Sequence, residues 1–242
     1  MKVGEEGSSN RFEKFLSDIG YKLNIKLPKE DEERLRNIFS DFLTGFGMMV
    51  DKGPIVTVFG SSRVTPEMDE YKLGAGVGRE LAKLGLTVLT GGGPGLMEAV
   101  NKGAHEANGS SIGINISIPE EQPANLYANP SITINYFFVR KVLLLKYSCA
   151  YIFLPGGFGT LDEFFETITL VQTGKITPRP LILVDRTFWK GLMEWVAERP
   201  KRGALISPGD TDCLYFADTA EEAIGIVKEC IHNGTINLEV GK

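Results

Sequence analysis

The chain has 242 residues, of which 24% are charged, and a formal net charge of −5. This length suits one large α/β domain or two small ones, and the mild negative charge gives no support for binding to nucleic acid. No apolar run is long enough to span a membrane, and the polar N-terminus lacks the apolar core of a signal peptide, so we expect a cytoplasmic protein.

Neither a metal site nor a disulfide framework is predicted from the cysteines and histidines. The three cysteines, Cys149, Cys213 and Cys230, lie far apart in the sequence, and the two histidines are His105 and His232. No Cys-x-x-Cys pair and no mixed Cys/His spacing typical of a zinc site is present. We therefore expect reduced thiols and no metal.

The N-terminal region comes first in chain order. Residues 1–50 are predicted to form an extension with one helix, over residues 31–47, where apolar side chains recur at helical spacing. Residues 51–242 are predicted to form a single Rossmann-like nucleotide-binding domain.

From residue 54 onward, strands and helices alternate. Predicted strands cover residues 55–59, 86–90, 111–116, 132–134, 149–154, 181–184 and 213–216. Predicted helices cover residues 66–84, 96–108, 137–147, 161–168, 188–199 and 219–231, the last capped by Asp218 or Thr219. Nearly all-apolar strands separated by helices predict a doubly wound, Rossmann-like parallel sheet with helices on both faces. Ligands in such α/β folds bind at the carboxyl ends of the strands.

The most informative segment is Pro-Gly-Gly-Phe-Gly-Thr-Leu-Asp-Glu, residues 155–163. It lies between a predicted strand and a predicted helix, an arrangement that directs backbone N–H groups at an anion. Glu163 adds a carboxylate one turn into the helix, so the segment predicts a phosphorylated substrate with chemistry close by. A structural alternative is a capping box, with Thr160 as the cap and Glu163 at the third position. Three glycines cost backbone entropy that a cap does not require, which favours a function.

A second glycine-rich turn, residues 91–98, follows another predicted strand. It is not a dinucleotide fingerprint, because Leu96 stands where Gly-x-Gly-x-x-Gly needs glycine, and it is not a Walker A loop. It could supply a second helix N-terminus to a phosphate, or it could be only a tight turn with close strand–helix packing.

Further polar candidates lie near the predicted sheet edge. Arg140 could hold a phosphate or a ribose hydroxyl in a fork geometry, although Arg140 and Lys141 also fit a solvated surface pair. Ser61 and Arg63 could contact a ligand or form a simple polar turn. Glu166 shares a helix face with Glu163, as it would in a solvated acidic stripe. The polar loop over residues 120–125 could be a lid.

The two glycine-rich segments and the Arg140-Lys141 pair resemble the LOG (Lonely Guy) family, whose hallmark is Pro-Gly-Gly-x-Gly-Thr-x-x-Glu preceded by Arg-Lys. The resemblance runs from about residue 55 to residue 231. It implies a homodimer that hydrolyses the N-glycosidic bond of a nucleoside 5′-monophosphate, AMP-like or a cytokinin riboside monophosphate, to free base and ribose 5-phosphate. Asp162, where glutamate is usual, and the long N-terminal segment resemble a longer bacterial branch.

The resemblance also implies roles for individual residues. Arg140 and Glu163 would be the catalytic pair. The residues that would bind the phosphate are Gly156, Gly157, Gly159 and Thr160. Other substrate contacts would come from Ser61, Gly92, Gly93, Glu98 and Lys141, with Glu98 near the ribose or the base.

Two other functions are alternatives to hydrolysis. Many members of the family were labelled possible lysine decarboxylases, but such enzymes usually hold pyridoxal phosphate on a lysine, and nothing singles out Lys141, Lys146 or Lys175 for that role. We therefore expect no cofactor. A nucleotide- or phosphate-binding regulator without turnover would share the glycine-rich loops and stays open as an alternative.

Overall fold

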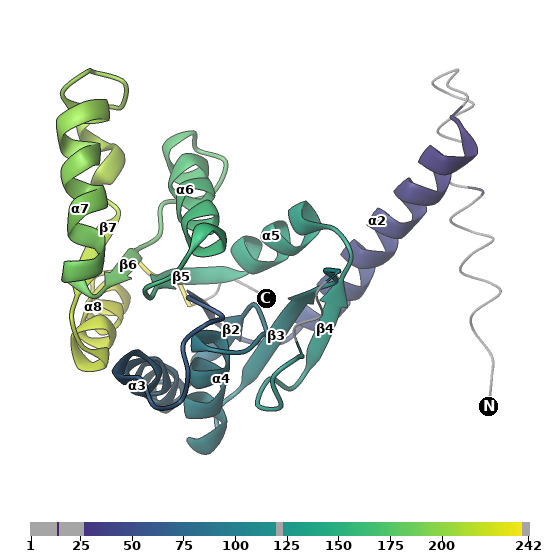
Figure 1. Ribbon diagram of the computed structural model, residues 1–242, viewed down its shortest axis with the longest axis horizontal. Helices are drawn as coiled ribbons and strands as arrows, with labels where there is room; N and C mark the ends of the chain where they lie inside the picture. Colours follow the sequence, from purple (N-terminus) through teal and green to yellow (C-terminus); the bar gives the residue numbers. More distant parts are fainter. Residues whose placement is uncertain (1–13, 15–26, 120–122, 239–242) are drawn as a thin grey trace. The chain divides into compact units, whose positions relative to one another are not determined.

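The computed structural model describes residues 14, 27–119 and 123–238 (Figure 1). The chain divides into two compact units, Met1–Ser40 and Asp41–Lys242. Helix α2 (Lys29–Met49) begins in the first unit and ends in the second. It contains the helix predicted over residues 31–47, whereas the domain boundary predicted at residue 50 stays a prediction.

Within the second unit, the described strands form a seven-stranded sheet in the order β4-β3-β2-β1-β5-β6-β7. All neighbouring pairs are parallel. The strands are β1 (Ile55–Phe59), β2 (Thr87–Thr90), β3 (Ser111–Ile116), β4 (Ser131–Ile134), β5 (Ser148–Phe153), β6 (Leu181–Val184) and β7 (Leu214–Ala217). Each lies within one residue of its predicted bounds.

Helices cover both faces of this sheet, which confirms the predicted doubly wound fold (Figure 1). One face carries α3 (Asp69–Lys83), α4 (Leu96–Glu106) and α8 (Ala220–His232), and the other carries α5 (Phe137–Lys146), α6 (Phe158–Gln172) and α7 (Arg186–Val196). Strands β1, β2, β5 and β6 are buried at every residue. Burial on both faces explains why these strands are mostly apolar and do not alternate between apolar and polar residues.

An aromatic row fixes α6 and α7 on their face of the sheet. Phe59 stacks on Phe153 at 4.9 Å between ring centroids, and Phe153 meets Phe164 of α6 edge to face at 5.5 Å. Phe164 in turn contacts Trp189 of α7 at 5.4 Å. These offset and edge contacts add to the apolar area that the rings bury, and they anchor the helix that carries Glu163.

The start of α6 corrects one sequence-based interpretation. The helix begins at Phe158 and has Gly157 as its N-cap, with no side chain accepting a cap hydrogen bond. Thr160 therefore lies inside the first turn, and the predicted capping box of Thr160 and Glu163 is wrong. Glycine and aromatic residues are poor helix formers, which is why the sequence pattern predicts a helix only from residue 161.

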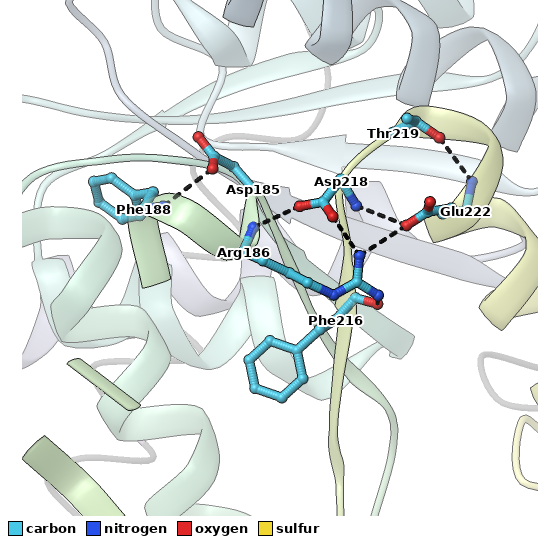
Figure 2. Close-up of polar contacts among 7 residues, drawn as sticks. All are labelled: Asp185, Arg186, Phe188, Phe216, Asp218, Thr219 and Glu222. Atoms are coloured by element: carbon cyan, nitrogen blue, oxygen red, sulfur yellow. Dashed lines mark hydrogen bonds and ion pairs between the residues drawn. The ribbon is translucent and has the colours of Figure 1, made fainter. Parts of the chain in front are cut away.

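Polar contacts join the segments that follow the last two strands, β6 and β7, as Figure 2 shows. Asp185 caps α7 by accepting a hydrogen bond from Phe188 N, so this helix begins two residues before its predicted start. Thr219 caps α8 by accepting from Glu222 N, which confirms one of the two predicted caps. Arg186 forms ion pairs with Asp218 at 2.5 Å and with Glu222 at 3.0 Å.

The topology indicates where a ligand binds. From β1 the strand order runs toward β4 on one side and through β5 toward β7 on the other, so the crevice between β1 and β5 is the topological switch point where α/β folds bind ligands. Among the described residues, no helix is both long and apolar enough to cross a membrane.

Candidate active site

A cavity of about 660 Å³ lies at the carboxyl ends of β1, β2 and β3, beside the start of α6. Its wall brings together segments that are far apart in the sequence. The predicted candidates among its lining residues are Ser61, Arg63, Gly93, Arg140, Gly157, Gly159, Thr160 and Glu163. The volume falls in the range of small-molecule pockets in proteins.

The first turn of α6 forms one part of this wall. The first hydrogen bond within the helix runs from Leu161 N to Gly157 O at 3.0 Å. The N–H groups that precede it in the first turn have no acceptor within a helix, and Gly159 and Thr160 line the cavity. An aligned row of such groups, together with the positive end of the helix dipole, favours a phosphate.

Gly156 does not line the cavity, although it was predicted to bind phosphate. A Cβ atom at this position would overlap Thr160 Oγ1. The glycine therefore lets the backbone pass close to Thr160, which is itself buried. In the structure, Gly156 therefore contributes to the shape of the turn.

The N-terminus of α4 differs from that of α6, because backbone covers it. Leu96 N donates a hydrogen bond to Ser61 O at 2.8 Å. A Cβ atom on Gly95, which has φ +71, would lie 2.5 Å from the same oxygen. The second glycine-rich turn thus packs against the loop after β1, and the expectation that this helix could also hold a phosphate is not supported.

Glu163 lies in the second turn of α6, 9% exposed, and lines the cavity. Burial raises the pKa of its carboxyl from 4.5 to about 7, with the positive charge of Arg140 opposing the rise and Asp162 adding to it. A carboxyl group with this pKa exchanges its proton near neutral pH, as a general acid or base must. The capping box therefore does not explain the position of this carboxylate, whose charge interacts with that of Arg140.

Arg140 enters the cavity from α5 and is held by two backbone carbonyls. Its Nε donates to Ile114 O of β3 at 2.8 Å, and its Nη2 donates to Gly91 O at 3.2 Å. Burial lowers the pKa of the guanidinium, and the charge of Glu163 opposes that shift. The two predicted catalytic residues therefore line the same cavity and interact through their charges.

The glycine turn after β2 lines the cavity through Gly91 and Gly93, whereas Gly92 lies behind it. Gly92 has φ +71, and its N–H donates to Thr90 Oγ1 at 3.0 Å. A Cβ atom at Gly92 would approach the Asn115 amide to 2.6 Å. The positive φ and the close packing both explain the need for glycine at this position.

Two predicted substrate contacts are not brought to the cavity. Glu98 accepts a hydrogen bond from Tyr71 Oη at 2.9 Å, between α3 and α4. Lys141 forms ion pairs with Asp162 at 2.8 Å and with Glu166 at 2.9 Å, joining α5 to α6. Both residues have structural partners within the domain.

Sequence reasoning missed several residues of the wall. Asn115 lines the cavity from the end of β3, and its Nδ2 donates to Ser131 Oγ at 2.8 Å. An asparagine inside an otherwise apolar strand was the available signal, since buried polar groups need partners. Apolar side chains complete the wall: Met97, Ile116, Ile118, Phe137 and Phe158. Of the loop considered as a lid, residues 120–122 lie outside the described residues, and Asn125 is buried.

Among the described residues, no group of three or more histidine, cysteine, aspartate or glutamate side chains has the arrangement of a metal site. Cys149 and Cys230 are buried as free thiols, and Cys213 is partly buried. Burial raises the pKa of the Cys149 thiol to about 11, which keeps it protonated and unreactive near neutral pH.

Known proteins resemble this chain over most of its length. The chain is 33% identical over 168 residues to the cytokinin riboside 5′-monophosphate phosphoribohydrolase LOG of Oryza sativa subsp. japonica, a match covering 67% of each chain. It is 28% identical over 191 residues to a protein of Arabidopsis thaliana with the same activity in its name, covering 77% of this chain and 87% of that one. A Mycobacterium tuberculosis protein, also so named, is 31% identical over 159 residues, covering 63% and 82%.

Solved structures share the fold of this chain, and a family model identifies its family. The molybdenum cofactor binding protein from Rippkaea orientalis matches with a TM-score of 0.55 and 24% identity, covering 75% of this chain and 99% of that chain. The solved structure of TM1055 matches with a TM-score of 0.53 and 25% identity, covering 73% and 99%. A family model described as "Possible lysine decarboxylase" matches residues 97–227. The chain therefore belongs to the LOG family, whose named relatives are phosphoribohydrolases.

Proposed function

We propose that the protein hydrolyses the N-glycosidic bond of a nucleoside 5′-monophosphate, giving a free base and ribose 5-phosphate. The observation that carries the proposal is a buried carboxyl group, Glu163, with a pKa of about 7 in the same cavity as an uncapped helix N-terminus. The names of the relatives support the same reaction class. The proposed substrate is an AMP-like nucleotide or a cytokinin riboside monophosphate.

The proposed binding mode follows from the geometry of α6. The 5′-phosphate binds the N–H groups of the first turn, near Gly159 and Thr160. Glu163 lies four residues after Gly159, about 6 Å further along the helix axis, and helical side chains lean back toward the N-terminus. Its carboxylate can thus approach the ribose while the phosphate stays at the helix end. The apolar wall that includes Met97 and Phe137 receives the base.

The reaction breaks the bond between ribose C1′ and the base nitrogen and forms a bond from C1′ to a water oxygen. Positive charge builds on the ribose as the base leaves, and the Glu163 carboxylate stabilises that charge or accepts the proton of the attacking water. The base departs with a proton, so atoms and charge balance without a further reactant. Arg140 holds the phosphate or a ribose hydroxyl and keeps the reacting bond in place.

A panel of substrates tests this proposal. The purified protein is incubated with AMP, other nucleoside monophosphates, a cytokinin riboside monophosphate and, as a control without phosphate, adenosine. We expect base and ribose 5-phosphate in equal amounts from at least one monophosphate. Adenosine is expected to release much less base, because it has no phosphate to bind at the helix N-terminus. Tight nucleotide binding with no base released would instead support the non-catalytic regulator.

The pH dependence of the reaction is a separate prediction. Glu163 acts as the carboxylate, so protonating it below a pKa of about 7 removes activity. Below that pKa, we expect kcat/KM to fall about tenfold for each further decrease of about one pH unit. The profile is measured by base release between about pH 5 and pH 9 in buffers of constant ionic strength. A profile that stays level down to pH 5 would contradict the role of Glu163 as a base.

We also propose that the protein forms a homodimer through the outer face of α5 and α6. Phe138 and Val142 of α5 and Phe165 of α6 are each about two-fifths to one-half exposed. The Lys141 ion pairs join these helices, so the three exposed apolar side chains lie on neighbouring helices. Burying them against a second copy would remove apolar area from water. Sedimentation equilibrium is expected to show a dimer for the parent and a monomer for Phe165→Asp, and a parent that stays monomeric would contradict this proposal.

A further inference from the structure

Three buried polar side chains form a network beside the glycine turn: Thr90, Asn101 and Asn125. Thr90 Oγ1 donates to Asn101 Oδ1 at 2.6 Å, and Asn125 Nδ2 donates to the same oxygen at 3.0 Å. None of the three lines the described cavity. They come from the end of β2, from α4 and from the segment after β3, so the network joins three parts of the fold.

The network holds the glycine turn through its backbone. Asn125 N donates to Gly92 O at 2.9 Å, and Asn125 Nδ2 donates to Gly93 O at 3.0 Å. The Gly92 N–H donates to Thr90 Oγ1. Glycine is the most permissive residue in backbone conformation, and a run of three glycines would otherwise sample many arrangements. These hydrogen bonds select one of them.

The selected arrangement matters because the next carbonyl in the turn holds Arg140. Of three consecutive carbonyl oxygens, Gly92 O and Gly93 O accept from Asn125, whereas Gly91 O accepts from Arg140 Nη2. The other anchor of the guanidinium is Ile114 O. Two fixed acceptors define the plane of a guanidinium group. If the turn relaxed, Gly91 O would move and Arg140 would be left with one anchor.

We infer that Asn125 is a positioning residue for Arg140, acting through the Gly91–Gly93 turn. The inference rests on the proposed function, because that reaction is what the position of Arg140 affects. The amide of Asn125 is suited to this role because all its hydrogen-bonding capacity is used. Its two N–H groups reach Gly93 O and Asn101 Oδ1, and its oxygen accepts from Tyr127 N and Ala128 N. A fully satisfied buried network is rigid.

Two substitutions test this inference. Asn125→Ser is neutral and too short to reach Gly93 O, and Asn125→Asp keeps the shape and the acceptor for Tyr127 N but loses both donors. Asn129→Ser, at an exposed position of the same segment, is the matched control. We expect kcat for base release to fall about tenfold or more in both Asn125 variants, with a smaller change in KM and no change in the control.

A second measurement separates positioning from a general loss of structure. The charge of Arg140 holds down the pKa of Glu163, so an Arg140 that moves away lets that pKa rise. The acid limb of the pH–rate profile is therefore expected to shift to higher pH in the neutral Asn125→Ser variant. An unchanged rate, or a reduced rate with an unmoved profile, would overturn the inference.

A crystal structure of the variants distinguishes failure of this inference from failure of the proposed function. If the parent protein released no base from any nucleotide, the proposed function would be wrong, and the structure alone would decide the positioning role. We expect the hydrogen bond from Arg140 Nη2 to Gly91 O to be lost in the Asn125 variants. If that bond keeps its 3.2 Å length, Asn125 does not position Arg140.

Discussion

Replacing Glu163 with glutamine is expected to lower the rate of base release by a factor of about 100 or more. Glutamine has nearly the same shape as glutamate but cannot accept a proton or carry the negative charge that stabilises the developing positive ribose. The substitution leaves the packing of α6 and the N–H groups proposed to bind phosphate unchanged, so KM is expected to change much less than kcat. Chromatographic assay of the free base from AMP, or from the best nucleotide of the panel, measures both parameters.

The stability of the same variant provides its control. The pKa of Glu163 is raised by folding, so its contribution to stability is fully present below about pH 4.5 and is lost as pH rises through about 7. Because glutamine does not ionise, the variant does not lose this stability as pH rises. The free energy of unfolding of the variant is therefore expected to equal that of the parent at low pH. Above pH 8 it is expected to be higher than that of the parent by about 3 kcal/mol at most. Denaturant unfolding at the two pH values measures the difference.

These two measurements can contradict the assignment in different ways. A variant that is stable but releases base at the parent rate would show that Glu163 takes no part in the chemistry. A variant that is destabilised at every pH would show that the carboxylate has a structural partner in the folded protein. Loss of rate together with a gain of stability at high pH is the pattern expected of a buried catalytic carboxylate.

Replacing Arg140 with lysine is expected to lower kcat/KM about 100-fold, although the positive charge is retained. The guanidinium reaches Ile114 O and Gly91 O at the same time through different nitrogens. An ammonium group has no planar fork, so it cannot keep both bonds and also present a donor to the substrate in a fixed direction. Steady-state kinetics with the substrate used for Glu163 measures the loss.

Arg79→Lys is the matched control for this substitution. Arg79 lies on α3 with its side chain 46% exposed, in a 3.9 Å ion pair with Glu106, and it does not line the cavity. An exposed ion pair of this kind contributes little to stability, so this variant is expected to retain the parent rate. If Arg140→Lys also retained it, charge alone would be sufficient at that position and the fork geometry would be irrelevant.

The strands and most of the helices could be predicted because their residues carry local signals. The inner strands are buried and mostly apolar, and glycine or proline follows closely on β1, β2 and β5, as at residues 155–157 after Leu154. The start of α6 could not be placed in the same way, because its first turn contains Phe158 and Gly159, residue types with poor helix propensity. The start of the helix is marked instead by the backbone hydrogen bond from Leu161 N to Gly157 O.

The candidate site could be predicted only in part for a different reason. Glycine turns at strand ends can be recognised from sequence, but the direction of a helical side chain depends on its neighbours in the fold. Arg140 and Lys141 are adjacent in the sequence, yet consecutive helical residues point about 100° apart, so one faces the cavity and the other faces α6. Asn115 and Asn125 have roles that depend on partners distant in the sequence, and no local pattern contains those partners.

The ion pairs of Lys141 have a mechanical consequence for the site. Arg140 and Glu163 are carried by different helices, so the gap between them depends on the angle between α5 and α6. Lys141 follows Arg140 in α5, and its side chain is only 17% exposed. It forms an ion pair with Asp162 of α6, the residue before Glu163. Sliding one helix past the other would break this brace and the bond to Glu166 together. A closing movement over a ligand that keeps these ion pairs intact would therefore come from the surrounding loops rather than from sliding of the two helices.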